Sequence, residues 1–426
     1  MKKQYLLVSI LLFLVSFIGY FNNLIIGPLL NNMAFDLKVS VSNLGFLVTL
    51  YGLVAGFISL IIGPFSDKFG RKKTIVLFAA LTAGTSLLFS FSWDLKTLFI
   101  FRFLNAMTAG PLIFCAIASV GDYIPAEKRG TVTGIVTSSM FIGTIVGVPM
   151  ALLLLKHPVL NWRASFYLIS FIAILTSLLV AFLLPRNKAA KTNSVISLKG
   201  ILKNYFSFFK DKKYLGFVTI FLLVSFSIGI FITYFPTYLL NNRKLSLDNL
   251  ILIYAIGGIF ALFFNLIAGR LSDKKNRKLL VITGSLIIAG MMVAIIHVAT
   301  TPSTLFITVL IISIFYMSAE AFRLTPLQTE ALIIVPLEFR GFFIGTIAFL
   351  IAGGTSLGAA FGSFLLSIKK GEYIKNLTLH GKNLPEKIHS LLFGFKTVTY
   401  ISIVAVFLSI ILILLYVKKR KQGQTI

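Results

Sequence analysis

Twelve long apolar segments constrain the fold of this chain more than any other feature. The 426 residues are 57% hydrophobic and only 12% charged, which excludes an ordinary soluble domain. A membrane-spanning helix needs about 20 mostly apolar residues. Segments of this kind lie near residues 4–30, 42–62, 74–92, 97–119, 131–155, 163–184, 214–240, 248–268, 279–299, 303–322, 341–367 and 395–417. The sequence therefore predicts an all-α membrane protein with twelve transmembrane helices.

A short charged loop joins the second and third segments, and a weaker copy of it occurs in the second half. The first copy contains Gly63, Asp67, Lys68, Gly70, Arg71 and Lys72. The second contains Gly269, Asp273, Lys274, Arg277 and Lys278, and its Gly, Asp and Arg each follow the first copy by 206 positions. Glycine allows close backbone approach and positive φ, so we expect a tight turn at Gly63 and Gly70. Charges beside hydrocarbon need partners or an aqueous face.

A second repeat confirms that the sequence is duplicated. Seven residues recur 211 positions later, from Pro125, Glu127, Arg129, Gly130, Gly134, Gly143 and Gly147 to Pro336, Glu338, Arg340, Gly341, Gly345, Gly354 and Gly358. We therefore expect two six-helix bundles, residues 1–184 and 214–426, joined by a linker, 185–213. Six helices in each half give both halves the same orientation in the membrane, as parallel repeats require.

The distribution of charge predicts the orientation of the chain. The formal net charge is +27, which in a soluble protein would suggest binding to nucleic acid. Here most of the 40 basic residues fall in the segments that are cytoplasmic if both termini are cytoplasmic, as the positive-inside rule demands. We therefore expect a multi-pass protein of the cell membrane, beside an anionic inner leaflet, and no nucleic-acid partner. The basic linker suits an amphipathic helix on that leaflet or a solvated flexible connection.

The loop Gly-x-x-x-Asp-(Arg/Lys)-x-Gly-Arg-(Arg/Lys) between helices two and three resembles the signature of the major facilitator superfamily of secondary transporters. Arg102, followed by Asn105, Thr108 and Gly110, resembles a second motif of that family on helix four. The segment Gly143, Gly147, Pro149, with Asn161-Trp162-Arg163 after it, resembles the twelve-helix drug:proton antiporter branch. The resemblance implies two bundles around a central cavity, alternating access, proton-coupled efflux of drugs or metabolites, and an inner gate closed by Asp67.

Two further expectations concern contacts between helices. Asp122, at the inner end of helix four, is the expected partner of Arg71 across the inner surface. Glycines four residues apart allow close helix contact, and a proline bends a helix. We therefore expect Gly143 and Gly147 to pack against a helix of the other half when the outer side is closed, with helix eight the leading choice.

In the superfamily, helices one, four, seven and ten line the cavity, and this implies a substrate site. Its residues in this chain would be Asn22, Asn23, Arg102, Tyr234, Glu320 and Arg323. Each has a simpler explanation: the asparagines can bond a neighbouring helix, Arg102 can extend to the outer surface, and Glu320 with Arg323 can form a structural ion pair near the inner interface. The antiporter branch often has an acidic residue where Asn22 and Asn23 stand. Acidic residues within the apolar segments are scarce, and we expect none at a membrane midpoint.

Two other classes of function remain to be compared with efflux. An uptake symporter for a nutrient or organic anion would use the same fold, with Arg102 or Arg323 binding the anion. A membrane enzyme would need converging His, Asp, Cys or Ser residues, and the sequence contains no such pattern and no phosphate-binding loop for ATP. We therefore expect no enzyme activity, no cofactor and no metal, a monomeric chain, a small-molecule substrate and a coupling proton.

Overall fold

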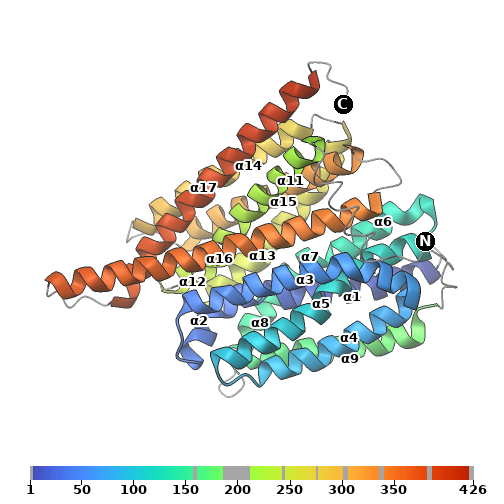
Figure 1. Ribbon diagram of the computed structural model, residues 1–426, viewed down its shortest axis with the longest axis horizontal. Coiled ribbons are helices and arrows are strands. Elements are labelled where there is room, and N and C mark those ends of the chain that lie inside the picture. The colour runs from blue at the N-terminus through green and yellow to red at the C-terminus, as the bar shows by residue number, and fades with distance from the viewer. Residues whose placement is uncertain are drawn as a thin grey trace. The chain divides into compact units, whose positions relative to one another are not determined.

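The computed structural model of the chain describes residues 3–156, 161–185, 212–241, 245–274, 277–300, 306–334, 340–380 and 386–421. These residues are helical apart from short turns (Figure 1). Twelve of the described helical segments are long and apolar enough to cross a membrane, as predicted. The predicted linker helix, between residues 186 and 211, lies outside the described residues.

The first half contains α1 (Lys3–Leu24), α2 (Ile26–Asp36), α3 (Val41–Phe69), α4 (Arg71–Ser90), α5 (Leu95–Tyr123), α6 (Ala126–Thr137), α7 (Ser139–Ile142), the π-helix η1 (Gly143–Gly147), α8 (Val148–Leu154) and α9 (Arg163–Leu183). The second contains α11 (Lys212–Ile232), α12 (Phe235–Asn241), α13 (Leu247–Lys274), α14 (Arg277–Thr300), α15 (Phe306–Ile334), α16 (Arg340–His380) and α17 (Glu386–Lys421).

The helices form two compact units. One contains the described residues of 1–37 and 50–211, and the other those of 38–49 and 212–426. Corresponding helices pack in the same pairs within each unit: α4 with α5 and α9 in the first, and α14 with α15 and α17 in the second. The sequence repeat is therefore also a repeat of helix packing.

Several helices extend beyond the apolar segments that predicted them. The helix α16 continues to His380, whereas its apolar segment ends near residue 367, and α17 begins at Glu386, before residue 395 (orange and red in Figure 1). Hydrocarbon thickness limits the apolar part of a helix, but polar residues can continue the same hydrogen-bond pattern outside it. Most of the residues between the last two apolar segments are therefore helical.

The extension of α15 changes the position of its charged residues. Its apolar segment ends near residue 322, which predicted a position for Glu320 close to the inner interface. In the structure the helix continues through Pro326 to Ile334, and Glu320 stands fourteen residues from each end. Glu320 is thus eight residues from Gln328, the nearer end of its span, rather than close to the inner interface. The expectation that no acidic residue lies at a membrane midpoint stays a prediction.

Candidate functional site

The charged loop of the first unit is a turn of a single residue. The helix α3 continues through Gly63 to Phe69, and only Gly70 leaves the helical conformation, at φ 90° and ψ 133°. The prediction of positive φ is thus confirmed for Gly70 and wrong for Gly63, whose backbone is helical. The side chains of Asp67 and Lys68, near the C-terminal end of α3, lie outside the described residues. The proposed gate at Asp67 therefore stays a prediction.

The turn places Arg71 beside the end of α5. Its Nε atom donates to Asp122 Oδ2 at 2.8 Å, which confirms the predicted contact between these residues. Arg71 also donates to the hydroxyl of Ser66, and Lys72 donates to the carbonyl of Leu184 at 2.6 Å, at the C-terminal end of α9. A cation at a helix C-terminus bonds carbonyls that have no partner in the helix. These bonds therefore join four helices of the first unit, α3, α4, α5 and α9.

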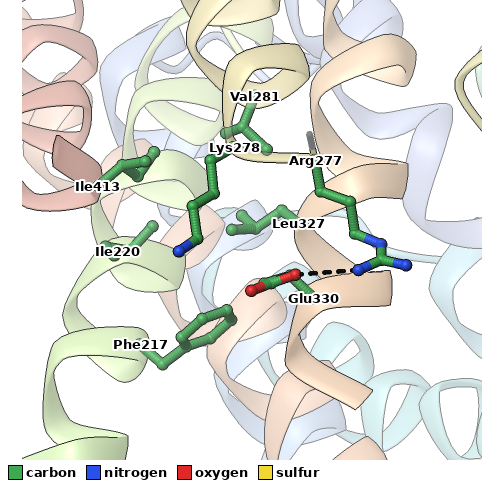
Figure 2. A pocket seen from close by; sticks show the side chains of 8 residues that line it. All are labelled: Phe217, Ile220, Arg277, Lys278, Val281, Leu327, Glu330 and Ile413. Carbon is green, nitrogen blue, oxygen red and sulfur yellow. Dashed lines mark hydrogen bonds and ion pairs between the residues drawn. The ribbon is translucent and has the colours of Figure 1, made fainter. Parts of the chain in front are cut away.

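The second unit has a matching ion pair that the sequence did not reveal. Arg277 begins α14 as Arg71 begins α4, and its Nη1 lies 3.4 Å from Glu330 Oε2, near the end of α15. Figure 2 shows that both residues of the pair line a pocket, together with Lys278 and apolar side chains. The pocket is lined by Phe217, Ile220, Arg277, Lys278, Val281, Leu327, Glu330 and Ile413.

Glu330 could have been found from the repeat. It follows Asp122 by 208 positions, between the offsets of 206 and 211 that relate the neighbouring segments. Of the other predicted residues in this loop, Gly269 lies in α13, and the side chains of Asp273 and Lys274 lie outside the described residues.

We predict a measurable coupling between Arg71 and Asp122. Alanine at either position should impair transport, and the double variant should lose less than the sum of the two losses, because the residues contact each other. For stability the coupling should be about 0.5–1 kcal/mol, since the pair is only partly buried. Strict additivity in a double-mutant cycle, with Lys73→Ala and Asp94→Ala as an unpaired control cycle, would contradict this.

The candidate cavity residues of the first unit form a buried polar network. Arg102 is fully buried, and its Nη1 atom donates to Asn22 Oδ1 at 2.7 Å and to Asn105 Oδ1 at 3.3 Å. The amide groups of Asn22 and Asn105 both donate to the hydroxyl of Ser86 on α4, at 3.3 and 3.0 Å. The guanidinium lies over the ring of Tyr51, 4.1 Å from its centre. Three helices, α1, α4 and α5, and the ring of Tyr51 on α3 therefore enclose this arginine.

The network decides between the alternatives for Arg102. A fully buried guanidinium does not extend to the outer surface, so that interpretation is wrong. Within the part of the chain that the structure describes, the ion pairs include none with Arg102, and its Nε atom has no hydrogen-bond partner. Asn23, by contrast, is exposed and lies outside the network. The structure thus separates the two asparagines that the sequence had grouped together.

The candidate residues of the second unit lie in two places. The hydroxyl of Tyr234 bonds Ser363 and donates to the carbonyl of Ala359 at 3.0 Å, which ties the turn between α11 and α12 to α16. Arg323 is fully buried, and its Nη2 donates to both carboxylate oxygens of Glu320, at 2.7 and 3.0 Å. Tyr234 therefore joins two helices, whereas Glu320 and Arg323 form an ion pair within α15.

The Gly-x-x-x-Gly-Val-Pro segment has a distinct backbone. Residues Gly143–Gly147 form one π-helical turn, and Pro149 is the second residue of the α-helix that follows. Proline lacks the N–H that would continue the α-helical pattern, and π turns occur where this pattern is interrupted. In the second unit Ala360 replaces Pro149, and α16 is α-helical throughout.

Both glycines of this segment face α1 of the same unit. A Cβ atom at Gly147 would lie 2.7 Å from the ring of Phe21, and one at Gly143 would lie 3.0 Å from Leu24. The expected close helix contact is present with α1, a helix of the same unit. The contact with a helix of the other half stays a prediction. The repeat preserves it: Gly354 and Gly358 contact α11, which corresponds to α1.

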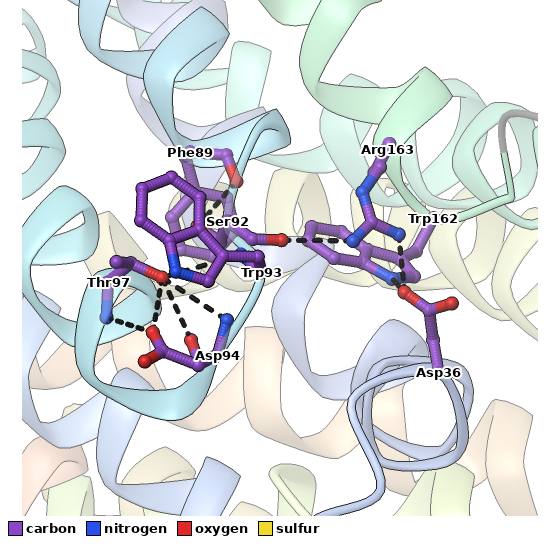
Figure 3. A network of polar contacts seen from close by, with 8 residues as sticks. All are labelled: Asp36, Phe89, Ser92, Trp93, Asp94, Thr97, Trp162 and Arg163. Atoms are coloured by element: carbon purple, nitrogen blue, oxygen red, sulfur yellow. Dashed lines mark hydrogen bonds and ion pairs between the residues drawn. The ribbon is translucent and has the colours of Figure 1, made fainter.

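A second polar network closes the opposite end of the first unit (Figure 3). Asp36, the last residue of α2, accepts hydrogen bonds from Trp162 Nε1 at 2.9 Å and from Arg163. Arg163 also donates to the carbonyl of Ser92 at 2.9 Å. The resemblance had singled out Trp162 and Arg163, but nothing in the local sequence indicated Asp36, 126 positions away from Trp162.

The start of α5 belongs to the same end of the unit. Asp94 caps the helix, and the hydroxyl and backbone N–H of Thr97 bond its carboxylate at 2.6 and 2.7 Å. These bonds hold the pKa of the Asp94 carboxyl below its usual value.

The described residues contain no group of three or more His, Cys, Asp or Glu side chains that could hold a metal ion.

Twelve apolar spans in two units with the same internal packing define a class of protein: multi-pass α-helical membrane proteins built from a duplicated bundle. A sequence model of the Major Facilitator Superfamily matches residues 12–359. The chain therefore belongs to this superfamily, whose members are transporters rather than enzymes.

Two curated relatives and one solved structure illustrate the similarity. Multidrug resistance protein 2 of Bacillus subtilis (strain 168) is 23% identical over 365 residues, which cover 83% of this chain and 87% of that protein. The hexuronate transporter of the same organism is 24% identical and covers 63% and 64% of the two chains. The fold resembles that of a bacterial homolog of the human lysosomal transporter Spinster, inward-facing and unoccupied, with a TM-score of 0.81, 16% identity, and 98% and 97% coverage.

Proposed function

We propose that this protein is a secondary transporter that exports small organic compounds across the cytoplasmic membrane in exchange for protons. The observation that carries the proposal is the Gly143–Gly147 π turn before Pro149, packed against α1. This segment resembles the motif of the antiporter branch. Similarity to a multidrug resistance protein over most of both chains supports the same direction of transport.

The charged residues suggest how the two states could alternate. Arg71 with Asp122, and Arg277 with Glu330, join the inner ends of corresponding helices in each unit. Each unit is thereby held as one body, which alternating access by rigid rocking requires. In this proposal both termini are cytoplasmic, and the chain acts as a monomer in a bilayer with an anionic inner leaflet.

Import of an organic anion is the second candidate function. Two buried arginines favour it, because Arg102 retains one nitrogen atom, Nε, and Arg323 retains two, Nε and Nη1, without a hydrogen-bond partner. A carboxylate could occupy such donors through charge-assisted bonds. The hexuronate transporter among the relatives transports, by its name, a compound with a carboxylate.

Transport in membrane vesicles of opposite orientation tests both candidates. Everted vesicles that are acidic inside should accumulate ethidium, a fluorescent organic cation, in a manner that a protonophore abolishes. Vesicles from cells without the protein are the control. Accumulation of radiolabelled glucuronate by right-side-out vesicles under an inward proton gradient, without ethidium transport, would overturn the export proposal and support import.

A further inference from the structure

Within the described residues, Glu320 is the one acidic residue deep within a membrane span. The sequence contains 13 acidic residues, and three of them fall within the twelve spans of the described chain. Asp122 and Asp248 are each one residue from a span end, whereas Glu320 is eight residues from Gln328, the nearer end of its span. An ionisable group at this depth is costly and marks function more often than structure.

Among the side chains that the structure describes, one countercharge, Arg323, lies beside Glu320. Arg323 holds both carboxylate oxygens through a single nitrogen, Nη2, and its Nε and Nη1 atoms have no partner. The other titratable side chains with an electrostatic interaction in this cluster are Tyr316 on α15 and Tyr254 on α13. The neighbours from α11 and α14, Phe231 against Tyr316 and Gly284 against Arg323, carry no charge.

The fold itself does not need this ion pair. The corresponding residues of the first unit, 211 positions earlier, are Ala109 and Leu112, and both are fully buried. The same helix packing thus forms around apolar side chains. Replacing a buried ion pair by apolar residues is often neutral or stabilising, so stability alone is a weak reason for the pair.

We propose, on the basis of the export function proposed above, that Glu320 is the residue that takes up and releases the coupling proton. A proton from water binds a carboxylate oxygen of Glu320, and the group becomes a neutral carboxylic acid. The ion pair is thereby lost, and Arg323 becomes a buried cation without a countercharge. A buried cation without a countercharge raises the free energy of this conformation. Protonation therefore favours a change of conformation in the second unit before the proton leaves to the other side.

Helix one cannot supply this proton site. Asn22 stands where the antiporter branch often has an acid, and its amide does not titrate. Its oxygen accepts from Arg102 instead. In this proposal the proton site therefore lies in the second unit.

Infrared difference spectroscopy of the full-length protein in lipid tests the proton site directly. Lowering the pH should produce the carbonyl band of a protonated carboxylic acid, and this band should be absent from Glu320→Gln. Asp94→Asn, which retains a helix-capping side chain outside the spans, should keep the band. If Glu320→Gln does not fold, Glu320→Gln/Arg323→Gln, which leaves no unpaired charge, takes its place. A band that persists in the variant would overturn the proposal.

Transport in proteoliposomes tests the coupling. Glu320→Gln should lose ethidium accumulation driven by a pH gradient and keep ethidium movement down its own gradient. Gradient-driven accumulation in the variant would overturn the coupling role even if the infrared band is lost. If the wild-type protein moves no ethidium, the export function fails, and the infrared measurement still decides whether Glu320 binds the proton.

Discussion

Replacement of Asn22 by leucine is expected to destabilise the protein by about 2–3 kcal/mol, because a hydrogen bond to a buried charged group is lost and cannot be replaced by water. Asn22 Oδ1 is the nearest acceptor of Arg102, at 2.7 Å. Replacement by aspartate should have the opposite sign and stabilise by roughly 1–2 kcal/mol, since it adds the countercharge and makes the bond charge-assisted. The measurement is reversible unfolding in mixed detergent micelles.

The control is the neighbouring position. Asn23 is exposed, and Asn23→Leu should leave the free energy of unfolding nearly unchanged. Equal losses at both positions would mean that the network around Arg102 contributes nothing specific. Destabilisation by Asn22→Asp would mean that Arg102 already has sufficient compensation.

The second large effect is expected at Gly358. A Cβ atom there would lie 2.2 Å from the carbonyl oxygen of Phe226 and 2.7 Å from the backbone nitrogen of Ile230. Backbone atoms cannot rotate away, so Gly358→Ala must separate α16 from α11, at a cost of about 3 kcal/mol. The thermal unfolding midpoint should fall accordingly, together with the yield of folded protein.

Alanine at two other glycines serves as the comparison for Gly358→Ala. Gly353 has open space where a Cβ would stand, and Gly353→Ala should be neutral or stabilise by up to about 1 kcal/mol through helix propensity. Gly147→Ala should fall between the two, because its neighbour is the side chain of Phe21, which can adjust. A similar effect of alanine at Gly353 and Gly358 would show that the contact between α11 and α16 is looser than the structure has it.

The fold was predictable from the sequence because the bilayer imposes a simple rule. Apolar length identifies a span, and two constant offsets identify the repeat. The ends of the helices were not predictable in the same way. The continuation of α15 beyond Pro326 depends on how the surrounding helices accommodate the proline, and it changed the depth of Glu320.

The candidate site was predictable only where short segments confine the residues. Arg71 and Asp122 each lie at a helix end on the same face of the membrane, so their contact followed from topology. Arg102 and Asn22 lie 80 positions apart in the interior of helices, and their bond depends on the rotation of each helix about its axis. Local sequence patterns do not specify that rotation, so the resemblance could name both residues but not their contact.

The buried position of Arg102 also makes the first unit responsive to the membrane potential. Within the described residues this arginine lacks a carboxylate partner, so the helix bundle around it carries a fixed positive charge inside the span. A full elementary charge that crosses the membrane changes in energy by about 2.3 kcal/mol per 100 mV. A tenth of that path is worth roughly 0.2 kcal/mol per 100 mV, so any tilt of this unit adds a small voltage dependence to the cycle.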